Sequence, residues 1–120
     1  MAKQKILLAE DDHTMVSLLT TLLTMEGYEV TSIDAGADVV AAARSIKPDA
    51  LILDVHLFGQ NGLDIMEKLR KSKDTNRLRV LMSSGANVRE ECIQRGADGF
   101  LMKPYMPDDL FNLLRRVISP

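Results

Sequence analysis

The sequence has little of several features that would set it apart from ordinary intracellular globular proteins. Its single cysteine, Cys92, has no second thiol for an internal disulfide, which suits a reducing compartment. No apolar run approaches the roughly 20 residues that a membrane-spanning helix needs. The run at residues 6–9 is also far too short for a secretory signal. These absences predict a soluble protein of the cytoplasm.

Positive charge is not in excess either. The chain has 15 Lys and Arg residues against 17 Asp and Glu residues, so its formal net charge is −2. A general binder of nucleic acid or of anionic membranes would carry an excess of cations. We therefore expect no direct contact with nucleic acid or membrane.

What the sequence does contain is enough for one ordinary globular domain. Of its 120 residues, 46% are hydrophobic and 27% are charged, which is typical of soluble globular proteins. A chain of this length buries roughly two-thirds of the surface that its unfolded form exposes. No linker, internal repeat or low-complexity segment divides the chain, so we predict a single domain over residues 1–120.

Strand-like and helix-like segments alternate along the whole chain. Most of the strand-like segments are unbroken apolar runs, which are typical of strands covered on both faces. Strands are predicted for residues 5–9, 28–33, 50–53, 80–82 and 99–102. Helices are predicted for residues 14–26, for a segment capped by Asp34 and ended by Pro48, for the segment after Gly62, for residues 88–95 and for the C-terminal segment. Because parallel strands need crossover connections, this alternation predicts an α/β fold with a parallel sheet and helices on both faces.

Polar side chains stand where four of the predicted strands end. They are Glu10-Asp11-Asp12, Asp54, Ser84 and Lys103. In an open parallel sheet, ligands bind outside the carboxyl ends of the strands, so we expect these side chains to meet at one edge. The site would combine several carboxylates with one hydroxyl and one ammonium group.

This set of groups indicates phosphoryl transfer assisted by a metal ion. Clustered carboxylates repel one another, so at least one of their pKa values should be raised unless a cation is present. Oxygen-only ligands in a sparse site suit Mg²⁺, which retains several waters. Asp54 is then the nucleophile toward phosphorus, while Lys103 and the Ser84 hydroxyl stabilise phosphoryl oxygens.

Each of these residues also has a simpler interpretation when it is taken alone. Asp54 is compatible with an ordinary loop carboxylate, and the acidic run at residues 10–12 with capping of the helix that follows. Ser84 is compatible with a turn residue and Lys103 with a solvated one. Cys92 is interpreted as a small filler in a short helix. Only the joint occurrence at four strand ends favours a functional site.

With these residues identified, the chain resembles the receiver domains of two-component response regulators over nearly its whole length. The resemblance is carried by Ile6-Leu7-Leu8-Ala9-Glu10-Asp11-Asp12, Leu51-Ile52-Leu53-Asp54, Asn61-Gly62, Ser84-Gly85 and Lys103-Pro104. It implies a doubly wound (βα)5 fold with the flavodoxin-like strand order 2-1-3-4-5. It also implies a signalling domain that is not a conventional enzyme, because it catalyses only its own Mg²⁺-dependent aspartyl phosphorylation and dephosphorylation.

The resemblance assigns a role to each residue of the acidic site. Asp54 accepts a phosphoryl group from the phosphohistidine of a histidine kinase or a phosphotransfer protein, as in a phosphorelay. Mg²⁺ is held by Glu10, Asp11, Asp54 and the backbone carbonyl of His56. Asp12 is the neighbouring acid and is not expected to be a ligand.

The resemblance further implies a switch made by Ser84 and Phe100. When Ser84 moves toward the phosphoryl group held by Lys103, Phe100 turns inward. This movement changes the face made by the fourth helix, fifth strand and fifth helix. An output domain or target protein is expected to bind there, and the sequence leaves a homodimer open.

Three positions depart from the usual family pattern. Phe58 stands where many members have proline, and Phe100 replaces the commoner tyrosine and so has no hydroxyl to exchange. Ala86, two residues after the switch serine, has no polar group to position an attacking water. We therefore predict slow loss of phosphate from Asp54, with His56 as the only nearby substitute.

Two alternatives belong to other functional classes: a constitutive binding module, and an enzyme of either the flavodoxin-like nucleotide-binding or the aspartyl-phosphatase kind. A degenerate receiver that acts as a constitutive binding module would have lost the acceptor or the lysine, and this sequence keeps both. A flavodoxin-like nucleotide-binding enzyme would need a glycine-rich phosphate loop after the first strand, where this chain has acids. An aspartyl-phosphatase would need a second acid two residues after its nucleophile, where His56 stands.

Overall fold

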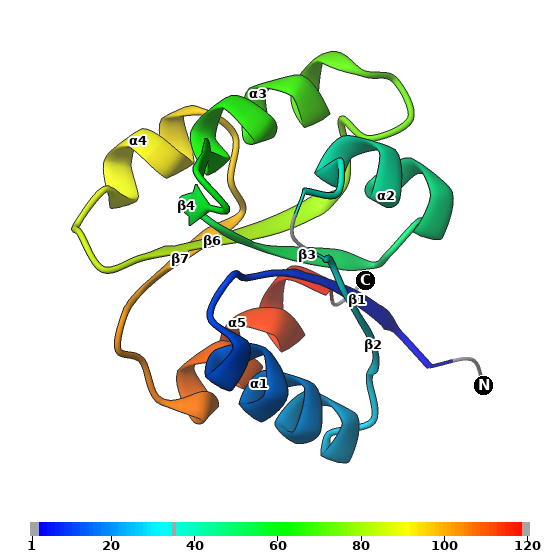
Figure 1. The fold of residues 1–120 in the computed structure, drawn as a ribbon, viewed down its shortest axis with the longest axis vertical. Coiled ribbons are helices and arrows are strands. Elements are labelled where there is room, and N and C mark those ends of the chain that lie inside the picture. Colours follow the sequence, from blue (N-terminus) through cyan, green and yellow to red (C-terminus); the bar gives the residue numbers. More distant parts are fainter. Residues whose placement is uncertain (1–2, 35, 119–120) are drawn as a thin grey trace.

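A computed structural model describes residues 3–34 and 36–118 of the chain. Strands and helices alternate along the described residues, as Figure 1 shows. The strands are β1 (Lys5–Ala9), β2 (Glu29–Ser32), β3 (Ala50–Asp54), β4 (His56–Leu57), β5 (Gln60–Asn61), β6 (Arg79–Ser84) and β7 (Gly99–Met102). The helices are α1 (His13–Met25), α2 (Val39–Ile46), α3 (Gly62–Lys71), α4 (Arg89–Gln94) and α5 (Pro107–Ile118).

The long strands form one five-stranded parallel sheet in the order β2-β1-β3-β6-β7. This order confirms the prediction 2-1-3-4-5, because β6 and β7 are the fourth and fifth strands of the sheet. Every residue of the central strand β3 is buried, as its unbroken apolar sequence predicted. In the register of β3 and β6, Asp54 at the end of β3 lies opposite Ser83 of β6.

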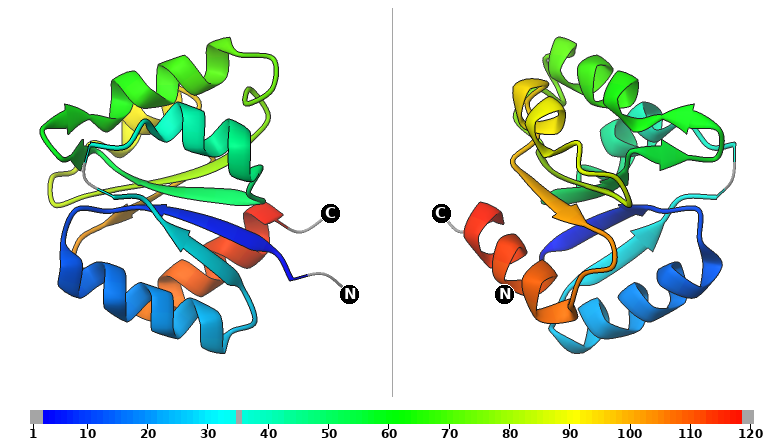
Figure 2. Two further views of the ribbon diagram at one scale, coloured as in Figure 1. Left: turned by 45° about the vertical axis from the view of Figure 1, so that its right-hand side comes forward. Right: turned by 90° about the vertical axis from the view of Figure 1, so that its left-hand side faces the viewer.

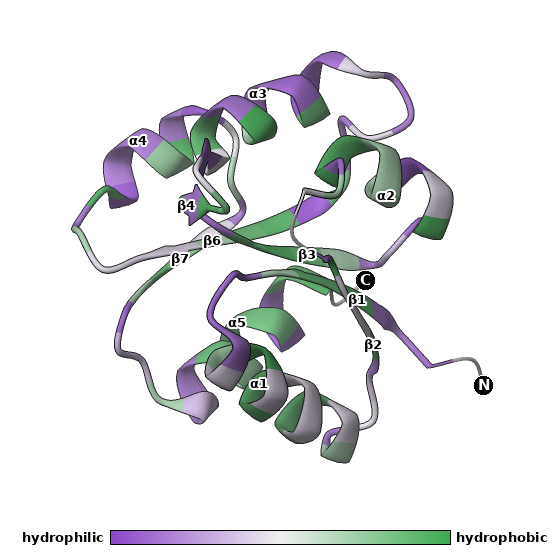
Figure 3. Cartoon of the chain, viewed as in Figure 1, coloured by the Kyte–Doolittle hydropathy of each residue, from purple (hydrophilic) through white to green (hydrophobic). Residues whose placement is uncertain are grey.

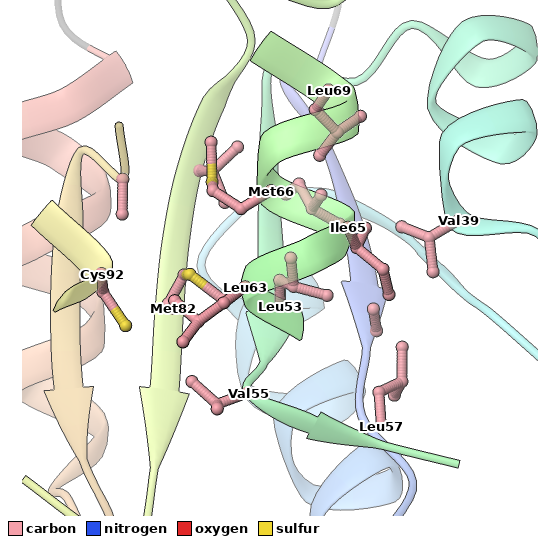
Figure 4. Packing of buried hydrophobic residues seen from close by; sticks show 14 of the residues in the cluster. Val39, Leu53, Val55, Leu57, Leu63, Ile65, Met66, Leu69, Met82 and Cys92 are labelled. Atoms are coloured by element: carbon pink, nitrogen blue, oxygen red, sulfur yellow. The ribbon is translucent and has the colours of Figure 1, made fainter. Parts of the chain in front are cut away.

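Helices cover both faces of the sheet, which is also as predicted. Figure 2 shows α1 and α5 on one side and α2, α3 and α4 on the other. Each face has its own apolar cluster, and Figure 3 shows much of the central strands β3 and β6 as hydrophobic. In Figure 4, Leu63, Met66 and Leu69 of α3 pack with Leu53 of β3 and Met82 of β6. This packing fixes α3 relative to the strand that ends at Asp54.

The start of the second helix differs from the prediction. Asp34 was expected to cap it, but α2 begins at Val39 and is capped by Asp38, whose Oδ1 accepts the N–H of Ala41 at 3.1 Å. Gly36 has a φ of 84°, which is incompatible with a helix that continues from Asp34. The prediction of Asp34 as the cap was therefore wrong.

The segment after β3 contains a small hairpin that the sequence did not predict. In this β4–β5 hairpin, His56 pairs with Asn61 and Leu57 with Gln60. Phe58 and Gly59 form its turn with φ values of 49° and 77°, and two consecutive positive φ values are typical of a type I′ turn. Strands of two residues are too short to show a period of two in the sequence.

The helices are short in relation to a lipid bilayer. Among residues 3–34 and 36–118, every helix falls short of the length and apolarity that crossing a membrane requires.

Candidate functional site

The sheet brings the predicted polar residues to one edge. Glu10 directly follows β1, Asp54 ends β3, Ser84 ends β6 and Lys103 directly follows β7. These four strands are consecutive neighbours in the sheet, and they all run in the same direction. Their carboxyl ends therefore form one continuous rim, where residues distant in sequence become neighbours.

Lys103 joins the two buried acids of this rim. Its Nζ lies 2.5 Å from Glu10 Oε1 and 2.8 Å from Asp54 Oδ2, which is hydrogen-bonding distance to both carboxylates. Glu10 is only 4% exposed and Asp54 only 5% exposed. Buried carboxylates require a compensating charge, and the ammonium of Lys103 supplies it. The peptide bond from Lys103 to Pro104 is cis.

Glu10 is fixed on its other side by the backbone of the acidic run. Its Oε2 accepts N–H groups from Asp11 at 3.0 Å and from Asp12 at 3.2 Å. Burial raises the pKa of Glu10, and Asp54 adds to the rise, while Lys103 opposes it. The raised pKa expected for clustered carboxylates is thus present, with burial as its largest cause. Burial opposes the ammonium form of Lys103, but its hydrogen bonds to Asp54 and Glu10 raise its pKa.

Asp11 and Asp12 have different roles, although they are adjacent. Asp12 caps α1, because its Oδ1 accepts the N–H groups of Thr14 at 2.9 Å and Met15 at 3.3 Å. Asp11 is exposed, and its Oδ2 accepts the N–H of Phe58 at 3.2 Å. The capping role that the sequence allowed for the acidic run therefore belongs to Asp12, while Asp11 connects the rim to the β4–β5 hairpin.

Glu10, Asp11 and Asp54 form a cluster of carboxylates that fits a divalent cation. One oxygen from each residue lies within 4.8 Å of the others. Three carboxylates without nitrogen or sulfur donors suit a hard ion such as Mg²⁺. His56 lies beside this cluster, and its backbone N–H donates to Asp54 Oδ1 at 3.1 Å. Its imidazole is exposed, and the ligand role of its carbonyl stays a prediction.

Ser84 lies on the rim and Phe100 lies in β7, and both make their contacts outside the carboxylate cluster. Ser84 is fully buried, and its Oγ accepts the N–H of Ala86 at 3.1 Å. Its backbone oxygen accepts the N–H of Lys103 at 2.8 Å, which ties β6 to β7. Phe100 is only 7% exposed and belongs to the apolar cluster that includes Cys92. Because the ring of Phe100 is already buried, the predicted inward turn would bury almost no further surface of it.

Two features near the rim were missed from the sequence. Tyr105 lies two residues after Lys103 and packs against the apolar cluster beneath α1 and α5. Burial raises its pKa to about 12, with a further contribution from the negative charge of Glu10. The bond from Phe58 N–H to Asp11 was also missed, because it depends on the unpredicted hairpin. The only sequence signal for Tyr105 was its closeness to Lys103.

Comparison with known proteins identifies the family. Residues 6–115 match the model of the response regulator receiver domain. The DNA-binding response regulator MtrA of Mycobacterium tuberculosis is 31% identical over 115 residues, which cover 94% of this chain and 50% of MtrA. A putative response regulator from Chloroflexus aurantiacus has a similar structure, with a TM-score of 0.91, 27% identity and coverage of 99% of this chain and 100% of that chain.

A further solved structure bears directly on the carboxylate cluster. The receiver domain of the sensor histidine kinase PA1611 from Pseudomonas aeruginosa contains a magnesium ion coordinated in its active-site cleft. It is 27% identical to this chain, with a TM-score of 0.88 and coverage of 99% of this chain and 100% of that chain.

The chain belongs to the response regulator receiver domains of two-component signalling. It is a phosphoacceptor domain with an acidic Mg²⁺ site made by Glu10, Asp11 and Asp54, and it is not a conventional enzyme. The chain spans about half the length of the curated relatives it matches, at 50% of MtrA.

Proposed function

We propose that Asp54 is the residue that accepts the phosphoryl group and that its modification switches a partner-binding face. The observation that carries this assignment is the position of Lys103, whose Nζ lies 2.8 Å from Asp54 Oδ2 at the rim. Asp54 is the member of the carboxylate cluster that receives both this ammonium and the N–H of His56. These donors stabilise the negative charge that phosphoryl transfer brings to the site.

The phosphoryl donor in this proposal is the phosphohistidine of a histidine kinase or of a phosphotransfer protein. An oxygen of the Asp54 carboxylate forms a bond to phosphorus while the phosphorus–nitrogen bond of the donor breaks. The electron pair of that bond stays on the imidazole nitrogen, which takes up a proton from solvent. Lys103 remains beside the new acyl phosphate and balances part of its charge.

The same residues would hold Mg²⁺ during transfer. Glu10, Asp11 and Asp54 supply carboxylate oxygens, and the His56 carbonyl is the further ligand that we propose. When bound, the ion supplies positive charge that neutralises the carboxylates and the phosphoryl oxygens. Lys103 then needs to neutralise less of the charge on Glu10, so it is freer to move toward the phosphoryl group.

The switch begins at Ser84 in this proposal. Phosphorylation adds about −1.5 to −2 units of charge and strong acceptor oxygens. The Ser84 hydroxyl then donates to a phosphoryl oxygen and changes its contact with the Ala86 N–H. Helix α4 follows directly, has only six residues and has no side-chain cap, so it is the element most easily shifted. In this switch Phe100 moves after α4 and not before it, because its ring is already buried.

The face that changes is formed by α4, β7 and α5. It includes Ile93, Met102 and Met106, which are 43%, 51% and 68% exposed. Exposed apolar side chains of this size are typical of surfaces that bind protein partners. We infer that a target protein, an output domain or a second copy of the chain binds here.

Labelling with a small phosphodonor tests the assignment of Asp54. The wild-type protein should incorporate radiolabelled phosphate from acetyl phosphate in the presence of Mg²⁺, and Asp54→Asn should incorporate none. Asp64→Asn is the matched control, because Asp64 is an exposed acid in the first turn of α3. Full labelling of Asp54→Asn would disprove the assignment.

Beryllofluoride with Mg²⁺ tests the switch separately. In the wild-type protein, amide shifts should change at Ser84, Ala86 and α4, and they should stay constant in Asp54→Asn. Changes restricted to Asp54 and Lys103 would contradict a switch through α4.

A further inference from the structure

Two adjoining hollows follow α2 and α3, on the sheet face opposite α1 and α5 (Figure 2). The first has a volume of about 620 Å³ and lies between the two helices. The second, of about 720 Å³, lies at the C-terminal end of α2 beside the chain that follows α3. Arg44 lines both of them, and its side chain reaches across from α2 to Ser72 and Asp74. We call the two hollows together the α2–α3 groove.

The α2–α3 groove is rich in cations that have no ion pair. Its lining includes Arg44, Lys47, Lys68, Lys71, Lys73 and Arg77. Arg44 pairs with Asp74 at 3.3 Å in an exposed ion pair. Within residues 3–34 and 36–118, the other five form no ion pair, although the whole chain has a net charge of −2. Asp38 also lines the groove, but its carboxylate caps α2.

The floor between these cations is partly apolar, with Val39 and Ile65 almost fully buried and Val40 half-buried. The first hollow is lined by Val39, Val40 and Ile65. The cations Lys68 and Lys71 also line it. A nucleic-acid backbone would use the cations but not the apolar floor, and the acidic sequence pI of about 5.6 opposes general binding of polyanions.

We propose that the α2–α3 groove binds an acidic peptide segment of a partner protein, with an apolar side chain seated between α2 and α3. The eight residues of α2 extend over about 12 Å, which matches about four residues of an extended peptide. The unpaired lysines would attract the acidic segment, and the apolar floor would hold it. This proposal is independent of phosphoryl transfer, and its test uses no phosphodonor.

Binding can be measured with a short labelled peptide that alternates glutamate and leucine. Fluorescence anisotropy should show binding by the wild-type protein that weakens as salt is added. The double variant with Lys68→Glu and Lys71→Glu should weaken binding by roughly tenfold, because two attractions become repulsions. Arg89→Glu is the charge-matched single control for Lys68→Glu, because Arg89 is exposed on α4, away from the groove (Figure 1).

Any one of the following results would overturn the proposal. The first is equal loss of binding in Lys68→Glu and Arg89→Glu, which would indicate attraction to the whole molecule. The second is binding of a labelled DNA oligonucleotide with the same affinity and the same dependence on Lys68, which would indicate a site for polyanions. The third is absence of peptide binding, or self-association of the wild-type protein in sedimentation that Lys68→Glu abolishes.

Mapping by NMR locates the bound peptide. Amide shifts are expected at Val40, Arg44, Ile65 and Lys68, and the variant peptide with serine in place of leucine should bind more weakly. Shifts confined to α4 and α5 would place the peptide on another face and exclude the groove.

Discussion

The ammonium of Lys103 is the central charge of the site. It lies within 2.8 Å of carboxylate oxygens from both Glu10 and Asp54, and these acids are almost fully buried. Burial raises the pKa of Glu10, so between its unfolded and folded pKa values the folded state binds more protons than the unfolded state. The stability contributed by Glu10 is therefore present below its unfolded pKa and is lost as pH rises through its folded pKa.

Lys103→Ala should destabilise the protein in a way that depends on pH. Without the ammonium, the pKa of Glu10 rises further and two buried carboxylates lack a counter-charge at neutral pH. We expect a loss of about 2–4 kcal/mol in the free energy of unfolding at neutral pH. The loss should shrink as pH falls and the carboxylates take up protons. Urea titrations at several pH values without Mg²⁺ measure it, and a loss that is constant with pH would contradict this account.

We expect the lifetime of the phosphorylated form to depend on the side chain at position 86. Ala86 is exposed and uses its backbone, not its side chain, to contact Ser84. With no polar group there to position water, phosphate should leave Asp54 slowly. Ala86→Asn should shorten the lifetime of labelled protein in Mg²⁺, and His56→Ala should lengthen it. A wild-type lifetime of seconds would refute the prediction.

At the scale of single elements, the junction between β3 and α3 determines where Asp54 lies. Gly62 begins α3, and its N–H donates to Val55 O at 2.6 Å. A Cβ at this position would lie 2.9 Å from Val55 Cα and would also meet the carbonyl oxygen of Asp54. The helix can start this close to the strand only because position 62 has no side chain.

Gly62→Ala should therefore disturb both stability and the site. We expect a loss of about 1–3 kcal/mol in the free energy of unfolding, because backbone atoms must move to admit the methyl group. Gly85→Ala is the control, because a Cβ there meets nothing within 4 Å. Thermal unfolding measures the loss, and equal melting temperatures for the two variants would show that the junction tolerates a side chain.

The single strands and helices also show how much of the structure can be predicted from the sequence. Residues 5–9 and 99–102 were predicted as strands with the bounds that the structure has, because each is an apolar run bounded by polar residues or glycine. The β4–β5 hairpin was missed because its pairing depends on positive φ at Phe58, a residue that rarely adopts it. The cap of α2 was misplaced because Asp34 and Asp38 are equally good caps by residue type, and tertiary packing selects between them.

At the scale of the whole molecule, strand order converted separate motifs into one site. The sequence placed Glu10, Asp54 and Lys103 at strand ends, and the parallel sheet then required that they meet. The details came from side-chain packing: Lys103 bridges two acids, Asp11 accepts from Phe58, and Phe100 is already buried. None of these contacts has a periodic or local signature, so the exact partner of each side chain could not be predicted from the sequence.

Arg70 connects α3 to the end of the sheet opposite the acidic rim, where β6 and β7 begin. Its guanidinium donates to the carbonyl oxygens of Leu78 at 2.7 Å and Gly96 at 2.8 Å, and it pairs with Asp98 at 3.1 Å. Asp98 also accepts the N–H of Val80 at 2.8 Å. These bonds join α3 to the amino ends of β6 and β7, on the side away from the acidic rim.

Arg70→Lys should destabilise the fold although it keeps the charge. A lysine cannot reproduce the planar fork that makes these contacts, so we expect a loss of about 1–3 kcal/mol in the free energy of unfolding. Arg95→Lys is the control, because Arg95 makes an exposed pair with Glu67 at 2.7 Å that should contribute about 0–1 kcal/mol. Urea unfolding compares the variants, and equal losses would show that the fork geometry has no importance.

The β4–β5 hairpin contacts both the carboxylate cluster and the α2–α3 groove, so we expect the two proposed ligands to be coupled. Phe58 N–H contacts the cation-binding acid Asp11, while Gln60 on the partner strand lines the groove between α2 and α3. A peptide that shifts this hairpin alters the affinity for Mg²⁺, and reciprocity requires Mg²⁺ to alter the affinity for the peptide by the same factor. Calorimetric titration of either ligand, with and without the other, would give that coupling constant twice.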